Sequence, residues 1–186
     1  RDSLDKILRE HCSQECLKAY DSNFKHDENL LSLLSSKGYL GLGLNEKYGG
    51  SGEDLYDLGI LFEQLGYHAA PLSLSGCLVD VAQTIQKFGN EKSCKDILGS
   101  IIAGEIYTSA ILEPSNQDPE NPITTAKIEN DQLIISGTKY LSEISSMAKS
   151  VLISANSNEG VLLALVESDK VKLTELSSTA NSPLFK

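Results

Sequence analysis

The chain has 186 residues, of which 40% are hydrophobic and 23% are charged, and its formal net charge at pH 7 is −10. The apolar content excludes global disorder. The longest unbroken apolar run, Val161–Val166, is far shorter than the roughly 20 residues that a membrane-spanning helix needs. The acidic balance disfavours nucleic acid and anionic membrane surfaces as partners.

Four cysteines fall in segments predicted to be helical, namely Cys12, Cys16, Cys77 and Cys94. A small secreted scaffold held by disulfides is denser in cysteine and richer in loops. We therefore expect a reduced, cytoplasmic protein. The first residue is Arg1 rather than Met, which predicts a piece of a longer chain.

Up to Ile106 the apolar residues recur at helical spacing, which predicts about five helices. Ser3 is the predicted cap of the first helix, and Leu55, Leu58, Phe62 and Leu65 are the predicted inward face of the third. A loop is predicted over Gly38–Gly52. The predicted helical segments are Leu4–Cys12, Leu30–Lys37, Leu55–Gly66, Pro71–Phe88 and Glu91–Ala103.

After Ile106 short β-prone runs alternate with turn-forming residues. The predicted strands are Tyr107–Leu112, Ile123–Glu129, Gln132–Ser136, Val151–Ala155, Val161–Val166 and Val171–Leu176. Helices first and strands afterwards predict an α+β fold of two segregated domains. We expect an all-α domain over residues 1–106, followed over residues 107–186 by an antiparallel β-sandwich or barrel.

Two groups of polar residues have plain structural interpretations. His11, Cys12 and Cys16 lack the second pair of ligands that a zinc site needs, so we interpret both cysteines as small apolar residues on a helix face and expect no metal. His68 follows a predicted helix and is interpreted as its C-terminal cap.

Several motifs follow one another in a fixed order. Gly41–Gly52 reads GLGLNEKYGGSG, Leu61–Gly66 reads LFEQLG, and Ala103-Gly104-Glu105 closes the helical half. In the β half, Leu112-Glu113-Pro114 precedes Asp118, and GTKYLSE spans Gly137–Glu143. This ordered set, from about Leu30 to Leu184, resembles the acyl-CoA dehydrogenase family, with Asn45 where the family has Pro.

The resemblance implies an oxidoreductase of acyl-CoA metabolism that removes the α-proton and a β-hydride from an acyl-CoA, with FAD as cofactor. It also implies a homo- or hetero-oligomer. The glutamate base of the family lies in a C-terminal four-helix bundle, which we expect to be missing here. No residue of this chain is therefore assigned as catalytic.

The resemblance also places five positions at the cofactor. Ile111 and Leu112 would contact the flavin through their main chain, with Leu112 where the family often has Thr. The other three positions are Asp118, where the family has Ser, Leu141, where it has an aromatic residue, and Glu143, where it has Thr. These replacements remove hydrogen-bond donors and add negative charge beside an anionic cofactor, so they weaken the expected binding of FAD.

Several alternatives stay open. Tyr48-Gly49-Gly50 is either a tight turn that needs a positive φ or a marker of the family fold. Glu113-Pro114 is either a plain strand end or a device that positions the main chain at the flavin, and Glu143 is either a solvated acid or a group near the flavin ring. For the whole chain, the alternatives are a non-catalytic structural or hetero-oligomer partner that has lost the flavin, and a helical adaptor with an incidental β tail.

Overall fold

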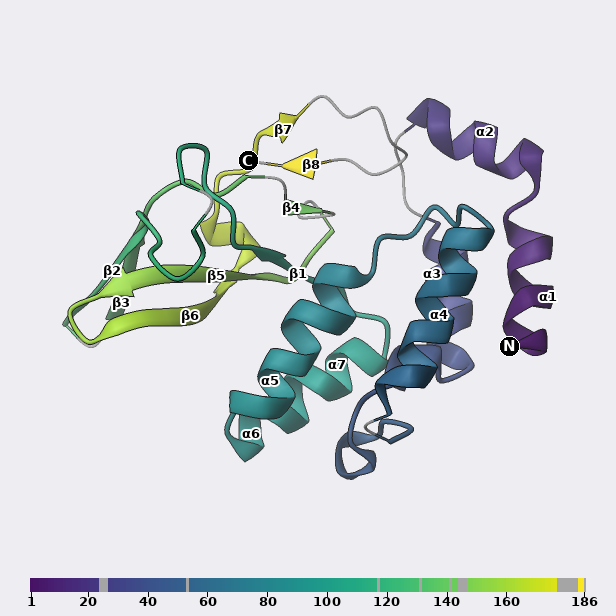
Figure 1. Ribbon diagram of the computed structural model, residues 1–186, viewed down its shortest axis with the longest axis horizontal. Coiled ribbons are helices and arrows are strands. Elements are labelled where there is room, and N and C mark those ends of the chain that lie inside the picture. The colour runs from purple at the N-terminus through teal and green to yellow at the C-terminus, as the bar shows by residue number, and fades with distance from the viewer. Residues whose placement is uncertain are drawn as a thin grey trace. The chain divides into compact units, whose positions relative to one another are not determined.

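The computed structural model describes residues 1–23, 27–52, 54–116, 118–130, 132–140, 142–143, 147–176 and 184–185 (Figure 1). The chain forms two compact units, one helical over residues 1–105 and one built of strands from residue 106 onward. The expected α+β fold class, with helices first and strands afterwards, is confirmed. Within the described residues no helix is both long and apolar enough to cross a bilayer.

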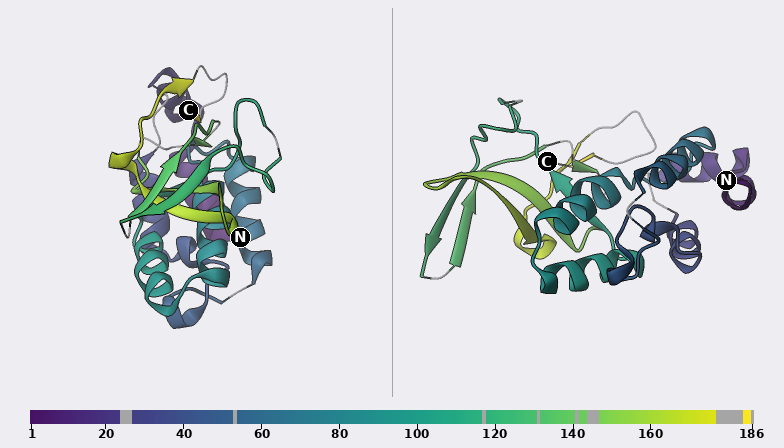
Figure 2. Two further views of the ribbon diagram at one scale, coloured as in Figure 1. Left: turned by 90° about the vertical axis from the view of Figure 1, so that its left-hand side faces the viewer. Right: turned by 60° about the horizontal axis from the view of Figure 1, so that its bottom comes forward.

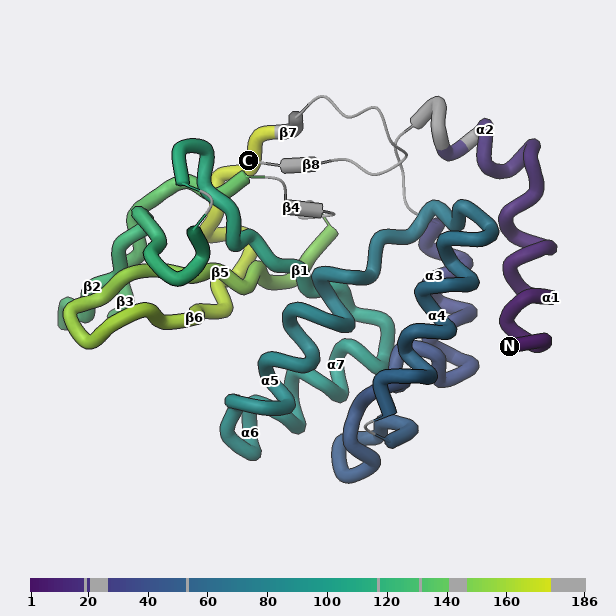
Figure 3. Tube along the Cα trace, viewed as in Figure 1, coloured from purple at the N-terminus to yellow at the C-terminus, as the bar shows by residue number. Residues whose placement is uncertain are grey.

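The helical unit contains the predicted helices and one further helix, α2 (Gln14–Asn23), whose span the sequence pattern did not define. The remaining elements of this unit are α1 (Asp2–His11), α3 (Glu28–Ser36), the 3₁₀ turns η1 (Tyr39–Gly41) and η2 (Glu46–Tyr48), α4 (Leu55–Tyr67), η3 (Gly76–Val81), α5 (Ala82–Phe88), α6 (Glu91–Ser93), η4 (Cys94–Leu98) and α7 (Gly99–Ile102). Figure 3 traces the chain through η1 and η2 between α3 and α4.

Polar side chains begin two of these helices. Asp27 caps α3 by accepting a hydrogen bond from the Leu30 N–H at 2.9 Å, and Asp54 caps α4 by accepting from the Tyr56 N–H at 2.8 Å. Each cap satisfies a main-chain donor that the helix leaves without an internal partner. The first helix differs from the prediction, because Arg1 rather than Ser3 occupies its N-cap position.

Two helical stretches are wound as π-helices. The segment η3 continues directly into α5, and α6, η4 and α7 also form one continuous helix, since the residues at each junction keep right-handed helical dihedral angles. The predicted start of a helix at Pro71 is wrong, because the chain becomes helical only at Ser75. Wider π turns shift the apolar residues around the helix, which a strict helical period does not anticipate.

A core of leucine side chains holds the helical unit together. Its fully buried members come mainly from the helices and from the loop between α3 and α4, and each contributes about 2–3 kcal/mol through burial. They are Leu4, Leu8, Leu30, Leu34, Leu40, Leu44, Leu61, Leu74, Leu78, Val81, Leu98 and Ile101. The prediction for α4 was wrong at one position, since Leu55 is 59% exposed while Leu61 is buried in its place.

The second unit contains two sheets. Its strands are β1 (Tyr107–Ala110), β2 (Thr125–Glu129), β3 (Gln132–Ser136), β4 (Ser142–Glu143), β5 (Ser150–Ser157), β6 (Gly160–Glu167), β7 (Glu175–Leu176) and β8 (Leu184–Phe185), with a 3₁₀ turn η5 (Ser168–Lys170). The larger sheet has the order β1-β5-β2-β3, with β6 also paired to β5, and the smaller has the order β4-β8-β7. The right-hand view of Figure 2 shows β5 and β6 as a long curved hairpin beside the β2–β3 hairpin.

The larger sheet is mixed, which corrects the expected antiparallel arrangement. β1 pairs with β5 in parallel, from Tyr107 opposite Ser150 to Ala110 opposite Ile153, whereas β5–β6 and β2–β3 are antiparallel hairpins. Parallel neighbours need a long crossover connection. Here that connection contains the β2–β3 hairpin, so no helical segment in the sequence marked the crossover.

Candidate functional site

The loop Gly41–Gly52 carries the motif of the helical half and is fixed by two glutamines of α5. The side-chain amide groups of Gln83 and Gln86 donate to the Gly43 carbonyl at 3.1 and 3.3 Å, and the Gln86 side-chain oxygen accepts from the Asn45 N–H at 2.7 Å. Two main-chain polar groups of the loop and two side chains are thereby paired. These hydrogen bonds attach the loop to α5 within the helical unit.

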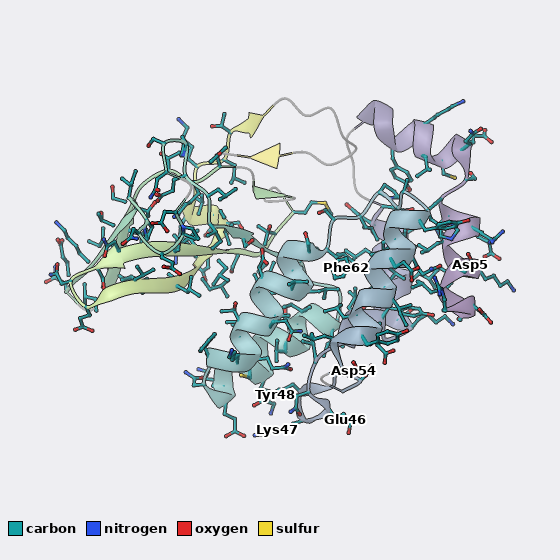
Figure 4. The ribbon with its side chains drawn as sticks, viewed as in Figure 1. Asp5, Glu46, Lys47, Tyr48, Asp54 and Phe62 are labelled. Atoms are coloured by element: carbon teal, nitrogen blue, oxygen red, sulfur yellow. The ribbon has the colours of Figure 1, made fainter. Side chains whose placement is uncertain are left out.

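The geometry of the loop requires glycine at both positions after Tyr48. Gly49 has a φ of 93°, in the left-handed region, and ends η2. A Cβ atom on Gly50 would lie 2.1 Å from the Leu44 carbonyl oxygen, which no real contact permits. Figure 4 shows Glu46, Lys47 and Tyr48 on η2, within this loop. The tight-turn interpretation of Tyr48-Gly49-Gly50 therefore has a structural basis.

In the β unit, two of the predicted cofactor positions lie directly after β1 and meet the segment before β4. The Leu112 carbonyl accepts a hydrogen bond from the Tyr140 N–H at 3.0 Å, and the Ile111 carbonyl accepts one from the Lys139 ammonium group at 3.3 Å. The Leu112 side chain is 38% exposed. The strand end at Ile111 and the segment at Tyr140 thus converge.

A buried ion pair lies at this junction. The Lys139 ammonium group is 2.9 Å from the Glu113 carboxylate, and the two side chains are only 8% and 4% exposed. Lys139 also donates to the Ser154 hydroxyl of β5 at 3.1 Å. One cation therefore connects the strand end, the segment before β4 and the central strand of the larger sheet.

Glu113 is the acceptor that closes the loop after β1. Its carboxylate accepts from the N–H groups of Ile123 and Thr124, each at 2.7 Å, in addition to the Lys139 ammonium group. Burial raises the pKa of Glu113, but the hydrogen bonds from Thr124, Ile123 and Lys139 outweigh burial and lower that pKa to about 2. Glu113 is thus ionised at neutral pH.

Asp118 uses its carboxylate within its own loop. One carboxylate oxygen accepts from the Glu120 N–H at 3.0 Å and the other from the Asn121 side-chain amide at 2.8 Å. These hydrogen bonds, that from the Asn121 side chain first, lower the pKa of the exposed Asp118 carboxyl below its ordinary value. Asp118 therefore carries its negative charge at neutral pH, as an element of the turn.

The other two predicted cofactor positions are only partly within the described residues. Leu141 lies outside them. Glu143 lies in β4, where its main chain pairs with Leu184 of β8, and its side chain is outside the description. The structure thus brings Ile111 and Leu112 to the segment that leads into Glu143.

A cavity of about 510 Å³ lies within the β unit. Its apolar lining comes from Ala110, Ile135, Val151, Ile153, Val166, Val171 and Leu173. Gly137, Thr138 and Lys139 also line it, but among the described residues Ile111 and Leu112 do not. Lys139 thus links the strand end to this cavity through the Ile111 carbonyl, although Ile111 and Leu112 are not among its described lining residues.

The polar residues of α1 and α4 have structural roles. His68 is the C-cap of α4, as expected, and its ring contacts the Asp5 carboxylate of α1 at 3.0 Å (Figure 4 labels Asp5).

Burial, together with the charges of Asp27 and Cys16, raises the pKa of the Cys12 thiol to about 11. Cys12 is therefore an uncharged thiol at neutral pH, which fits its interpretation as a small apolar residue.

Sequence reasoning named the strand-end residues but missed the pair that holds them. Lys139 served only to align a motif, and Glu113 was left open between two interpretations. The only signal was that a glutamate and a lysine of opposite charge stand in two consecutive motifs, and it was weak because the β half contains many other acidic and basic residues. Charged residues are buried only when they are paired.

Known proteins share both the sequence pattern and the fold. The profile of the acyl-CoA dehydrogenase N-terminal domain matches residues 1–105. The chain is 30% identical over 138 residues to the acyl-CoA dehydrogenase FadE12 of Mycobacterium tuberculosis, a match that covers 73% of this chain and 36% of that protein.

Two solved structures have similar folds. The first is a variant of the Tcur3481–Tcur3483 steroid ACAD, with a TM-score of 0.89 and 29% identity over 98% of this chain and 52% of that chain. The second is a glutaryl-CoA dehydrogenase from Mycobacterium smegmatis in complex with FADH2, with a TM-score of 0.80 and 18% identity over 99% of this chain and 51% of that chain. The chain thus spans about a third of the curated relative and half of each solved chain. The matched profile covers more than half of the 186 residues, and the chain belongs to the acyl-CoA dehydrogenase family.

Proposed function

We propose that the chain forms part of a flavoprotein subunit that dehydrogenates an acyl-CoA thioester at its α and β carbons, with FAD as cofactor. The observation that carries this proposal is the hydrogen bond from the Tyr140 N–H to the Leu112 carbonyl, which joins the segment before β4 to the end of β1. When bound, FAD would accept the hydride from the β carbon of the substrate. The main chain of Ile111 and Leu112 would face the cofactor.

The residues at this strand end fit a flavin as a wall of main chain and apolar side chain. Leu112 is partly exposed and can cover a flat ring, and its carbonyl is already held by Tyr140. The Leu112 side chain has no donor for the ring, however, and the Asp118 carboxylate is engaged with Glu120 and Asn121. The cofactor would thus depend on main-chain contacts here.

The remaining parts of the proposal concern the whole subunit. We propose that residues 1–106 and 107–186 are its first two domains, the second incomplete, and that the catalytic glutamate belongs to a C-terminal bundle outside these residues. A cytoplasmic location and a homo- or hetero-oligomer complete the proposal.

A second candidate function is that of a partner subunit that keeps the fold without binding flavin. The apolar Leu112 side chain and the negative charge of Asp118 favour it, because both differ from the flavin-binding pattern of the family. The similar Tcur3481–Tcur3483 structure bears the names of two components, which supports a hetero-oligomeric alternative.

The purified protein distinguishes these functions through its absorbance near about 450 nm, where bound flavin absorbs. If the proposal holds, the protein is yellow as isolated or after incubation with FAD, and an acyl-CoA bleaches the absorbance as the flavin is reduced. A protein that stays colourless after incubation with FAD contradicts the flavin proposal and supports the partner subunit.

A matched pair of variants extends this test. Leu112→Thr restores a side-chain donor at the predicted ring position, whereas Leu133→Thr makes the same change at an exposed position of β3. We expect Leu112→Thr to raise the affinity for FAD and Leu133→Thr to leave it unchanged. Equal affinities of both variants would show that Leu112 does not face the cofactor.

A further inference from the structure

Lys139 is buried and makes three polar contacts with three different segments of the β unit. Its ammonium group reaches the Ile111 carbonyl at 3.3 Å, the Glu113 carboxylate at 2.9 Å and the Ser154 hydroxyl at 3.1 Å. A lysine ammonium group has three protons to donate. The three contacts therefore use its full donor capacity, which no apolar side chain at this position could replace.

Glu113 extends this network to the loop that follows β1. Besides Lys139, its carboxylate accepts hydrogen bonds from the main-chain N–H groups of Ile123 and Thr124. The buried Glu113 side chain thereby joins the start of the loop to its end at Ile123 and Thr124. The position of Glu113, and of the Leu112 peptide beside it, is set by contacts on both sides.

The network and the strand-end contact reinforce each other. Lys139 binds the Ile111 carbonyl, and the next residue, Tyr140, donates its N–H to the Leu112 carbonyl. Two consecutive residues of one segment thus hold two consecutive carbonyls of the other. A shift of either segment would break both contacts together.

A role in stability alone does not account for this arrangement. Burying two charges costs about as much desolvation free energy as their attraction returns, so a well-packed neutral pair is often equally stable. A neutral pair would nevertheless lose the hydrogen bond from Lys139 to the Ile111 carbonyl. Compared with a neutral pair, the charged pair therefore adds little net stability. What it adds is the hydrogen bond from Lys139 that fixes the Ile111 carbonyl in place.

We propose that Lys139 and Glu113 are positioning residues, which hold the main chain of Ile111 and Leu112 at the Tyr140 segment so that it can face a bound cofactor. This inference rests on the proposed function for its purpose, while the positioning itself concerns contacts of this chain alone. Leu112 has no donor in its side chain, so only main-chain groups at this position could form hydrogen bonds with the flavin. Holding that main chain in place would keep those contacts available.

The test uses amide hydrogen exchange of the purified full chain carrying the double substitution Lys139→Met and Glu113→Gln, which removes both charges and retains the volumes. We expect exchange of the Tyr140 amide to rise about tenfold or more, while amides of β5 and β6 change by less than about twofold. The control Lys127→Met, which removes an exposed lysine from β2, should change neither.

Two results would overturn the inference. Unchanged exchange at Tyr140 in the double variant would show that the pair does not hold the strand end. An equal rise throughout β5 and β6 would show a general structural role. If the double variant does not fold, Ser154→Ala removes one hydroxyl contact of Lys139 and should raise exchange at Tyr140 about threefold; no rise would likewise overturn the inference.

Flavin binding by the same proteins separates this inference from the proposed function. If the wild-type protein binds FAD, the double variant should bind it about tenfold more weakly while it keeps the same circular dichroism. Equal binding would contradict the link between positioning and the cofactor. If the wild-type protein stays colourless, the proposed function fails, and the exchange comparison still decides whether Lys139 and Glu113 position the strand end.

Discussion

The loop Gly41–Gly52 and the strand end at Ile111–Glu113 keep their shapes in different ways. The loop relies on neutral groups, since Gln83 and Gln86 pair with its main chain and Gly50 admits the Leu44 carbonyl. The strand end relies on the buried charges of Lys139 and Glu113. The loop retains nearly all of the motif quoted for it, whereas at the strand end we propose that Leu112 replaces a side chain that would contact a cofactor. Two parts of this chain are thus held in place by two different kinds of polar contact.

The largest expected effect breaks the loop. Gly50→Ala places a Cβ atom 2.1 Å from the Leu44 carbonyl oxygen, so the main chain must move. We expect the helical unit to lose at least about 3 kcal/mol of unfolding free energy, measured by urea denaturation followed by circular dichroism.

Gly59→Ala is the matched control, because nothing lies within 4 Å of a Cβ atom at that position of α4. It should stabilise the same unit by about 0.5–1 kcal/mol, since alanine favours a helix interior. Equal losses for the two variants would contradict the close packing of Gly50.

Lowering the pH tests the buried ion pair of Lys139 and Glu113 at the strand end, because acid protonates Glu113. The pKa of Glu113 is lowered from 4.5 to about 2, so its ionised form stabilises the folded β unit. That contribution, about 3 kcal/mol relative to a protonated Glu113 beside the charged Lys139, is complete above the ordinary pKa and disappears as the pH falls from about 4.5 towards 2. Exchange protection of β5 amides should therefore decline over this range.

The neutral double variant Lys139→Met and Glu113→Gln supplies the comparison for the acid experiment. Without the carboxyl group at position 113, the protection of β5 should depend less steeply on pH between about 4.5 and 2. The same slope in the variant and in the wild type would show that other carboxyl groups cause the acid sensitivity.

A smaller effect is expected from Gln86→Leu. This substitution removes the acceptor of the Asn45 N–H and one donor to the Gly43 carbonyl, so the loop should lose about 1–2 kcal/mol of stability. Lys47→Met, which breaks an exposed ion pair with Glu91 near the same loop, should leave the unfolding midpoint unchanged. A larger loss for Lys47→Met than for Gln86→Leu would reverse the assigned importance of the two contacts.

Local patterns in the sequence predicted most of the elements. Asp54 marked the start of α4, Gly38 marked the end of α3, and the β-prone runs coincided with the longer strands. These features depend on neighbouring residues, so a short window contains the necessary information.

Two features that depend on distant residues were not predicted. The parallel pairing of β1 with β5 and the pairing of Lys139 with Glu113 join residues far apart in the chain. Leu55 also matched the apolar period of α4, but it is 59% exposed. Motif order identified Ile111 and Leu112 as candidates, while the network that holds them became visible only in three dimensions.

The parallel neighbour of β1 has a consequence for how the protein is made. A ribosome adds about 5–20 residues per second, so Tyr107 emerges several seconds before its partner Ser150 has been synthesised. During that interval the edge of β1 that later pairs with β5 lacks its partner strand. The nascent chain can then pair wrongly with neighbouring chains. A chaperone would therefore protect it most in the interval before β5 is complete.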